Sequence, residues 1–173
     1  MQPRKNHLGL VRAFAKLRTQ PLISNPCNLV ISGGKGWLYD QVLREVRTLG
    51  LNERVKLIGY ADDEDLPALY RAAAAFVFPS FYEGFGLPPL EAMACGVPVV
   101  TSNTSSLPEV VGDAGLAVNP HDVDALANAL NTALTDETWR AQAITRGLER
   151  AKTFTWQRAA EQLLGVYERV MHA

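Results

Sequence analysis

The stretch PSFYEGFGLPPLEAMACGVPVV, residues 79–100, has the residue types of an anion-binding loop. Gly84 and Gly86 remove side chains at positions where backbone amides could approach a ligand. Pro88 and Pro89 suit the first turn of a helix, in which a missing N–H group costs little. A glycine loop that leads into a helix N-terminus favours phosphate oxygens, because its free amides and the helix dipole both present positive charge. The sequence therefore predicts a phosphate site in this loop.

Two glutamates flank the predicted phosphate site: Glu83 in the loop and Glu91 in the predicted first turn of the helix. Carboxylates repel phosphate, so we expect them to accept hydrogen bonds from hydroxyl groups, which sugars and riboses supply. The simpler interpretation makes Glu83 a surface acid and Glu91 an acid that complements the helix dipole. The combination of both glutamates with the glycine loop favours the first interpretation.

The sequence predicts strands and helices that alternate along the chain. Short β-branched runs predict strands at 28–32, 55–58, 75–78, 98–101 and 116–118. Apolar residues at helical spacing predict helices at 6–18, 37–49, 64–73, 88–94, 107–111, 123–134, 137–152 and 156–171. This order implies an α/β fold with a mainly parallel sheet covered on both faces. Ligands of such sheets bind at the carboxyl ends of the strands, where the glycine loop is expected.

Length and composition favour one globular domain. The chain has 173 residues, 47% of them hydrophobic, and a net charge of −1, which excludes intrinsic disorder. The longest apolar run, 72–78, is far shorter than the roughly 20 residues that a membrane-spanning helix needs. Basic residues interrupt the first 20 positions where a secretory signal would need an apolar core, so we expect a cytoplasmic protein.

Basic residues are concentrated near the start of the chain. Residues 1–39 contain six of them and no acid: Arg4, Lys5, Arg12, Lys16, Arg18 and Lys35. Such a segment favours phosphates, an acidic partner or an anionic membrane surface. The alternative is a solvated face of the predicted helix at 6–18, for which Asn6 is the expected N-cap.

Two further patterns have simpler structural interpretations. SGGKG (32–36) follows a predicted strand but lacks the spacing of a dinucleotide-binding loop, so we expect a turn that enters a helix. The acids Asp62, Asp63, Glu64 and Asp65 resemble a metal cluster, but most of them are expected to cap the helix at 64–73. We therefore expect no metal site.

The spacing of Glu83 and Glu91 within EGFGLPPLEAMACGVPVV resembles the E-x7-E signature of retaining GT-B glycosyltransferases of family 4, also called group 1. Other parts of the chain are similar to further segments of that family: PRKN (3–6), LVISGGKGW (29–37), VKLIGYADDEDLPALY (55–70), SSLPEVVGDAGLAVNP (105–120) and FTWQRAAEQLLGVYERV (154–170). The resemblance is strongest to bacterial GDP-mannose-dependent mannosyltransferases of surface-polysaccharide synthesis. It implies a Rossmann-like parallel sheet with helices on both faces, the C-terminal half of a GT-B fold.

The resemblance also implies roles for individual residues. Lys5 matches the lysine that pairs with the donor diphosphate. Glu83 matches the glutamate placed against the transferred sugar and is the expected catalytic residue, while Glu91 matches the one that binds the ribose hydroxyls. The amides of Phe85, Gly86 and Leu87 are expected to meet the sugar hydroxyls and the distal phosphate. The expected nucleobase segment contains Tyr60, Ala61 and Asp63.

The reaction implied by the resemblance moves a hexose, expected to be mannose, from a nucleotide diphosphate sugar with retention at the anomeric carbon. It needs no metal and no cofactor beyond the sugar nucleotide, expected to be GDP-mannose. The expected acceptor is a glycan or a lipid-linked glycan, and no nucleic acid is expected as a partner. Peripheral contact with the inner face of the membrane is left open.

The resemblance implies that residues 1–173 form a donor-binding domain that ends in the helix at 156–171. The family's N-terminal acceptor domain, and the strand that precedes PRKN with its glycine turn and arginine, lie outside this chain. That strand would be the central one of a doubly wound sheet, so we expect this fragment alone to be inactive. Two alternatives stay open: a GT-B-fold sugar-nucleotide epimerase, and a non-catalytic nucleotide-sugar-binding or interaction domain.

Overall fold

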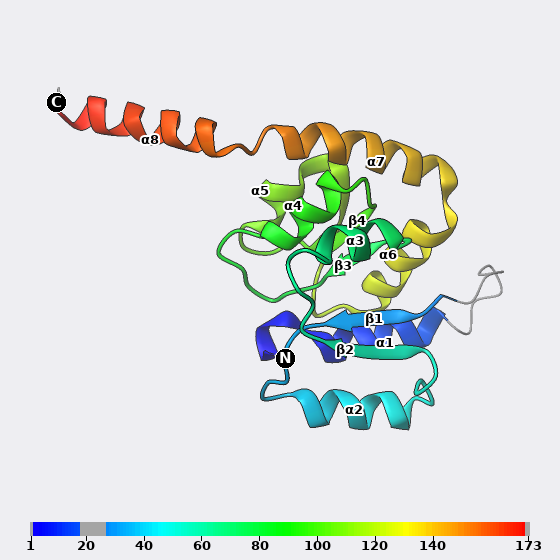
Figure 1. The fold of residues 1–173 in the computed structure, drawn as a ribbon. Coiled ribbons are helices and arrows are strands. Elements are labelled where there is room, and N and C mark those ends of the chain that lie inside the picture. The colour runs from blue at the N-terminus through cyan, green and yellow to red at the C-terminus, as the bar shows by residue number, and fades with distance from the viewer. Residues whose placement is uncertain (1, 18–26, 172–173) are drawn as a thin grey trace.

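The computed structural model describes residues 2–17 and 27–171 (Figure 1). The strands are β1 Leu29–Ser32, β2 Val55–Gly59, β3 Phe76–Phe78, β4 Val99–Ser102 and β5 Gly115–Val118. The helices are α1 His7–Leu17, α2 Tyr39–Thr48, α3 Leu66–Ala72, α4 Leu87–Ala94, α5 Leu107–Val111, α6 Val123–Thr135, α7 Glu137–Lys152 and α8 Trp156–Met171. Short 3-10 turns, η1 Pro3–Lys5 and η2 Gly112–Ala114, precede α1 and β5. Every predicted strand and helix is confirmed, although Arg18 at the predicted end of α1 lies outside the described residues.

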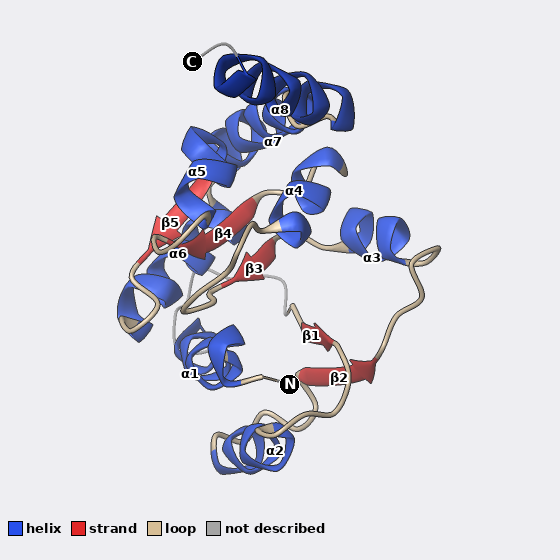
Figure 2. Ribbon diagram, turned by 90° about the vertical axis from the view of Figure 1, so that its left-hand side faces the viewer, coloured by secondary structure: helices blue, strands red, loops and turns tan. Residues whose placement is uncertain are grey.

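The strands form two parallel sheets instead of one. β1 pairs with β2, and β3, β4 and β5 pair in that order, all in parallel. Figure 2 shows the five strands in one twisted row, with a wider separation between β3 and β1 than between paired neighbours. The parallel pairing confirms the predicted fold class.

Helices cover both faces of the strands, as predicted. α1, α2 and α6 lie along one face in Figure 2 and share a core cluster with β1 and β4, through Ile31 and Val100. The neighbouring residue on β4, Val99, points to the other face and packs with α4 and α5. Successive strand residues alternate between faces, so β4 contributes to both cores, and all four of its residues are buried.

The amino end of α1 is held by Asn6, in agreement with the predicted N-cap. The Asn6 side-chain oxygen accepts a hydrogen bond from the Gly9 N–H at 3.2 Å. Its amide group donates to the Pro120 carbonyl at 2.7 Å, which ties α1 to the loop after β5. Asn6 is buried and has a left-handed backbone (φ 54°), a conformation that Asn tolerates better than most residues.

The acidic run before α3 does not act as the sequence predicts. α3 begins at Leu66, two residues later than expected, and its first turn contains no acid. Asp65 occupies the N-cap position, but its side chain makes no capping hydrogen bond. The prediction that these acids cap and charge the helix is therefore wrong. Backbone hydrogen bonds from Asp65 and Leu66 to the Asp62 carbonyl form the turn instead.

α8 continues from α7 and extends away from the rest of the molecule (Figure 1). Its boundaries, Trp156–Met171, agree with the prediction, and none of its residues is buried. Large apolar side chains stay exposed along it, including Leu164, Tyr167 and Val170. Within residues 2–17 and 27–171, no helix is both long enough and apolar enough to cross a membrane.

Candidate functional site

The fold brings Lys5 and Glu83, which are far apart in sequence, into direct contact. Lys5 ends η1 at the amino end of α1, and Glu83 lies in the loop between β3 and α4. The Lys5 Nζ atom is 2.7 Å from Glu83 Oε1 and 4.3 Å from the centre of the Phe78 ring. Arg4 adds a second cation, because its Nη1 atom is 2.5 Å from Glu83 Oε2. One carboxylate therefore lies between two cations at the carboxyl end of β3.

Backbone contacts fix η1 against the loop after β3. The Phe81 N–H donates to the Arg4 carbonyl at 2.7 Å, and Arg4 Nη1 donates to the Tyr82 carbonyl at 3.3 Å. Arg4 and Lys5 are thus held in two ways. They directly precede α1 in the chain, and Arg4 is hydrogen-bonded to the loop that contains Glu83. Sequence analysis did not assign Arg4 a role, although its position beside Lys5 in PRKN was a signal for it.

Glu83 is buried, with 10% of its side chain exposed, and its charge is compensated locally. Burial alone raises the pKa of this carboxyl group. The two cations beside it, Lys5 and Arg4, outweigh burial and hold the pKa of Glu83 below its ordinary value. Glu83 is therefore an anion at neutral pH, which a general acid would not be.

Two serines from the loop after β4 hold the glycine loop in shape. The Glu83 N–H donates to Ser105 Oγ at 3.0 Å. Ser106 Oγ is 3.0 Å from the Glu83 carbonyl oxygen and 2.6 Å from the Phe85 carbonyl oxygen, so its one proton serves both acceptors. Ser105 has a left-handed backbone (φ 53°), a conformation that costs energy for a non-glycine residue and is common at functional sites. Sequence analysis missed both serines.

Gly86 is the N-cap residue of α4 and lies too close to a neighbour for a side chain. Its φ is 116°, and a Cβ atom there would be 2.8 Å from Leu107 Cδ2. Pro88 and Pro89 remove two of the four amides that a helix start normally leaves free. Of these four amides, those of Gly86 and Leu87 are the two that remain for an anion.

Glu91 lies one turn into α4 and not in its first turn, so that part of the prediction is wrong. The helix starts at Leu87, and its first turn contains no acid. This excludes the alternative in which Glu91 complements the helix dipole. Instead, the Tyr70 hydroxyl of α3 donates to Glu91 Oε2 at 2.9 Å. Burial and this hydrogen bond raise the pKa of Tyr70 well above its ordinary value, so the hydroxyl stays a donor.

Tyr60, Ala61 and Asp63 lie across the break in the strands from Glu83. They belong to the β2–α3 loop, and β2 is part of the other sheet. Tyr60 is 72% exposed, and its hydroxyl is 3.5 Å from Asp63 Oδ1, the outer limit for a hydrogen bond. The structure thus places the predicted nucleobase segment and the charged cluster at the ends of different strands.

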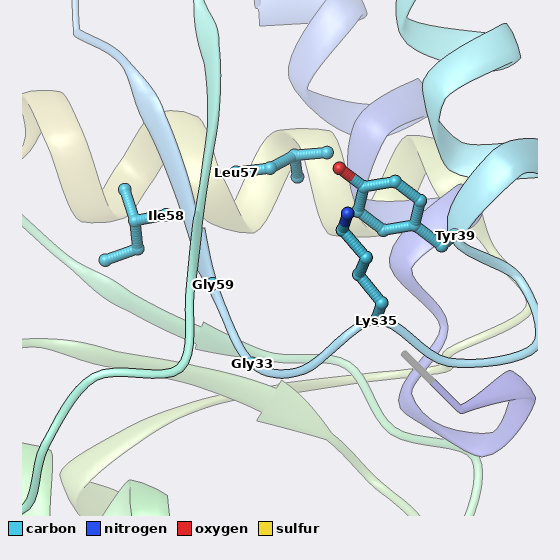
Figure 3. Close-up of a pocket in the computed structure, with 6 residues that line it drawn as sticks. All are labelled: Gly33, Lys35, Tyr39, Leu57, Ile58 and Gly59. Carbon is cyan, nitrogen blue, oxygen red and sulfur yellow. The ribbon is translucent and has the colours of Figure 1, made fainter.

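A pocket of about 260 Å³ opens next to this loop, at the carboxyl ends of β1 and β2. Six residues line it: Gly33, Lys35, Tyr39, Leu57, Ile58 and Gly59. Figure 3 shows Leu57 pointing toward the Tyr39 ring and Ile58 pointing away. The Lys35 Nζ atom is 5.4 Å from the centre of that ring. SGGKG is a turn that leads to α2, as predicted, and it supplies one wall of the pocket.

The chain is similar to known proteins in both sequence and fold. Residues 1–150 match the family described as Glycosyl transferases group 1. The chain is 50% identical over 169 residues to O-antigen chain mannosyltransferase B of Escherichia coli, covering 97% of this chain and 44% of that protein. Sucrose-phosphate synthase from Thermosynechococcus elongatus has a TM-score of 0.84 and 33% identity, over 99% of this chain and 43% of its own.

HepE from Anabaena, solved in complex with UDP-glucose, has a TM-score of 0.82 and 26% identity, over 95% of this chain and 46% of its own. These likenesses define an α/β domain of GT-B glycosyltransferases. The chain belongs to the group 1 glycosyl transferases. It spans less than half the length of each of these relatives. The roles of the individual site residues stay predictions.

Proposed function

We propose that this chain is the donor-binding part of a retaining glycosyltransferase that transfers mannose from GDP-mannose. The observation that carries the proposal is the contact between Lys5 and Glu83, in the loop that leads to the amides of Gly86 and Leu87 at the start of α4. Cations and free amides at the carboxyl edge of parallel strands are suited to a diphosphate. The named activity of the relative O-antigen chain mannosyltransferase B supports mannose as the sugar.

In this proposal Lys5 and Arg4 neutralise the diphosphate. Both cations contact Glu83 in the structure, so diphosphate oxygens compete with the carboxylate for them. As the bond from the sugar to the phosphate breaks, its electrons pass to the departing diphosphate, and the two cations and the loop amides stabilise that charge. Glu83, an anion at neutral pH, orients the sugar and supports positive charge that develops at the anomeric carbon.

Glu91 binds the ribose hydroxyls in this proposal, and the Tyr70 hydrogen bond holds its carboxylate in place. The segment with Tyr60, Ala61 and Asp63 lies near the nucleobase. The proposal assigns neutralisation of the diphosphate to Lys5 and Arg4 and includes no metal ion. The proposed acceptor is a glycan or lipid-linked glycan of surface-polysaccharide synthesis, at the cytoplasmic face of the membrane.

Calorimetric titration of the chain with GDP, GMP, UDP and ADP tests the donor site. We expect GDP to bind selectively, and Lys5→Ala to weaken GDP binding by at least about tenfold while it changes GMP binding less. Glu91→Ala should weaken both guanine nucleotides, because both contain the ribose. Lys56→Ala changes an exposed lysine on β2 and serves as the control. Absence of all nucleotide binding by the folded chain would contradict the proposal and favour a non-catalytic interaction domain.

We also expect the 173-residue chain by itself to transfer no sugar, because the relatives are more than twice its length. The measurement is release of GDP from GDP-mannose in the presence of mannosylated acceptors. Turnover by the purified chain would show that it contains a complete active site.

A further inference from the structure

Among the described residues, Glu91 is held by a neutral donor and not by a cation. The Tyr70 hydroxyl donates to Glu91 Oε2 at 2.9 Å. None of the ion pairs in the described part of the chain involves Glu91, whereas Glu83 takes part in two. A neutral donor orients a carboxylate without cancelling its charge, and it occupies one of about four acceptor positions. The exposed Glu91 carboxylate therefore keeps its charge and most of its acceptor positions for a ligand.

The Tyr70 ring is fixed by its neighbours. It packs edge-on against Phe76 of β3, with ring centres 5.3 Å apart and an angle of 77° between the planes. Tyr70, Phe76 and Cys95 all pack against one core cluster. Burial and the neighbouring Glu91 raise the pKa of Tyr70 well above its ordinary value, so the hydroxyl keeps its proton at neutral pH. The ring thus presents a constant donor at a fixed point beside Glu91.

The hydrogen bond between Tyr70 and Glu91 joins two parts of the proposed site. Tyr70 lies on α3, the helix that follows the predicted nucleobase segment at 60–63. Glu91 lies on α4, whose start contains the amides that are proposed to bind the diphosphate. The ribose of a nucleotide connects its base to its diphosphate, so the proposed function requires a ribose between these two elements. The hydrogen bond links the same two elements.

We propose that Tyr70 is a positioning residue that makes the site selective for a sugar with both ribose hydroxyls. Its hydroxyl holds Glu91 Oε2, which leaves Glu91 Oε1 to accept hydrogen bonds from the vicinal hydroxyls, and Tyr70 itself does not contact the nucleotide. Without this anchor the exposed Glu91 side chain would lose its freedom only on binding, which costs about fivefold in affinity for one immobilised side chain. The inference rests on the proposed function and adds the residue that controls its ribose selectivity.

Calorimetric titration with GDP and 2′,3′-dideoxy-GDP tests this inference, because the two nucleotides differ only in the ribose hydroxyls. We expect the parent chain to bind GDP at least about tenfold more tightly than the dideoxy analogue. Tyr70→Phe keeps the ring against Phe76 and removes only the hydroxyl. It should weaken GDP binding by about threefold to tenfold and leave binding of the analogue within about twofold of the parent. The unchanged affinity for the analogue also shows that the variant is folded.

Two further comparisons show whether Tyr70 acts through Glu91. Glu91→Ala should abolish the preference for GDP, and the addition of Tyr70→Phe to it should cause no further loss, because both substitutions remove the same hydrogen bond. Tyr167→Phe removes the hydroxyl of an exposed tyrosine on α8 and is the matched control. This control should bind both nucleotides as the parent does.

The possible outcomes separate this inference from the proposed function. A parent chain that binds no nucleotide contradicts the proposed function, and one that binds both nucleotides alike contradicts the role of Glu91; either result overturns the inference as well. If Glu91→Ala loses the preference for GDP and Tyr70→Phe retains it, only the inference is overturned. Equal weakening of both nucleotides by Tyr70→Phe would assign the hydroxyl a purely structural role and would also overturn it. Additive losses in the double variant would do the same.

Discussion

At the scale of single residues, the charged cluster combines a binding task with a structural one. Glu83 is the counter-ion that allows Arg4 and Lys5 to lie close together on a half-buried loop. Removal of the carboxylate would leave two cations facing each other, and protonation would have a similar effect. The proposed site is therefore part of what holds η1 to the loop after β3.

Glu83→Gln should destabilise the fold at neutral pH by about 1.5 to 3 kcal/mol, because it removes charge-assisted hydrogen bonds. The folded pKa of Glu83 is below the ordinary value of 4.5, so the stabilisation is present above that pH and is lost as the pH falls through the folded pKa. Urea unfolding at several pH values measures it. The variant and the parent should converge in acid, whereas Glu64→Gln, at an exposed position, should stay close to the parent throughout. A constant difference down to the acid limit would contradict this account of the cluster.

His7, the first residue of α1, gives a second source of acid sensitivity. Burial, helped by the positive charge of Lys5, lowers the pKa of His7 from 6.5 to about 4. The unfolded chain binds the proton more readily, so folding stability should fall as the pH drops from about 6.5 to about 4. His7→Phe, which cannot titrate, should reduce that fall by about 1 to 2 kcal/mol after solvent screening is allowed for. An NMR titration that placed the pKa of His7 above 6 would rule the effect out.

At the scale of elements, the junction between β3 and α4 depends on two glycines in different ways. Gly86 has a left-handed backbone and faces Leu107 of α5 at close range. Gly84, two residues earlier, has open space where a side chain would point. Packing therefore requires glycine at position 86 but not at position 84, and a substitution at Gly84 can serve as the control for one at Gly86.

Gly86→Ala should destabilise the chain by about 2 to 4 kcal/mol, because the new Cβ atom meets Leu107 Cδ2 and the backbone is strained. Gly84→Ala should change stability by less than about 0.5 kcal/mol. Chemical denaturation of both variants is the measurement. Equal changes in stability at the two positions would contradict this account, because only Gly86 contacts α5.

At the scale of the whole molecule, α8 contributes little to the folded body. It has no buried residue and an exposed apolar side, whereas Phe154 just before it packs edge-on against Phe85 at 5.9 Å. A cut after Thr155 therefore separates a helix without a core contact from a body that keeps this aromatic pair.

Removal of the residues after Thr155 should leave the unfolding midpoint within about 2 °C of the parent. It should also raise the highest concentration at which the chain is still monomeric, because it removes the exposed apolar side of α8 and such surfaces promote association. Differential scanning calorimetry and light scattering measure the two effects. A fall in Tm of more than about 8 °C would show that α8 packs on the body in solution.

The sequence by itself determined the elements of this protein and its family. Helical spacing set α6, α7 and α8 almost residue for residue, because i to i+4 hydrogen bonds and caps such as Asp122 and Asp136 are local. Glu83 and Glu91 lie in one short segment, so their spacing is also a local feature, and it indicated the glycosyltransferase family. The prediction that the acids before α3 cap that helix was wrong, because the amides of Asp65 and Leu66 bond to the Asp62 carbonyl instead of to an acidic side chain.

Only the tertiary structure decided which groups meet. The pairing of Glu83 with both Lys5 and Arg4 depends on how α1 crosses to the end of β3, and no local pattern contains that crossing. The same holds for Tyr70 on Glu91 and for the serines that hold the loop. The division of the strands into two sheets also depends on the tertiary structure, because strand pairing joins segments that are distant in the sequence.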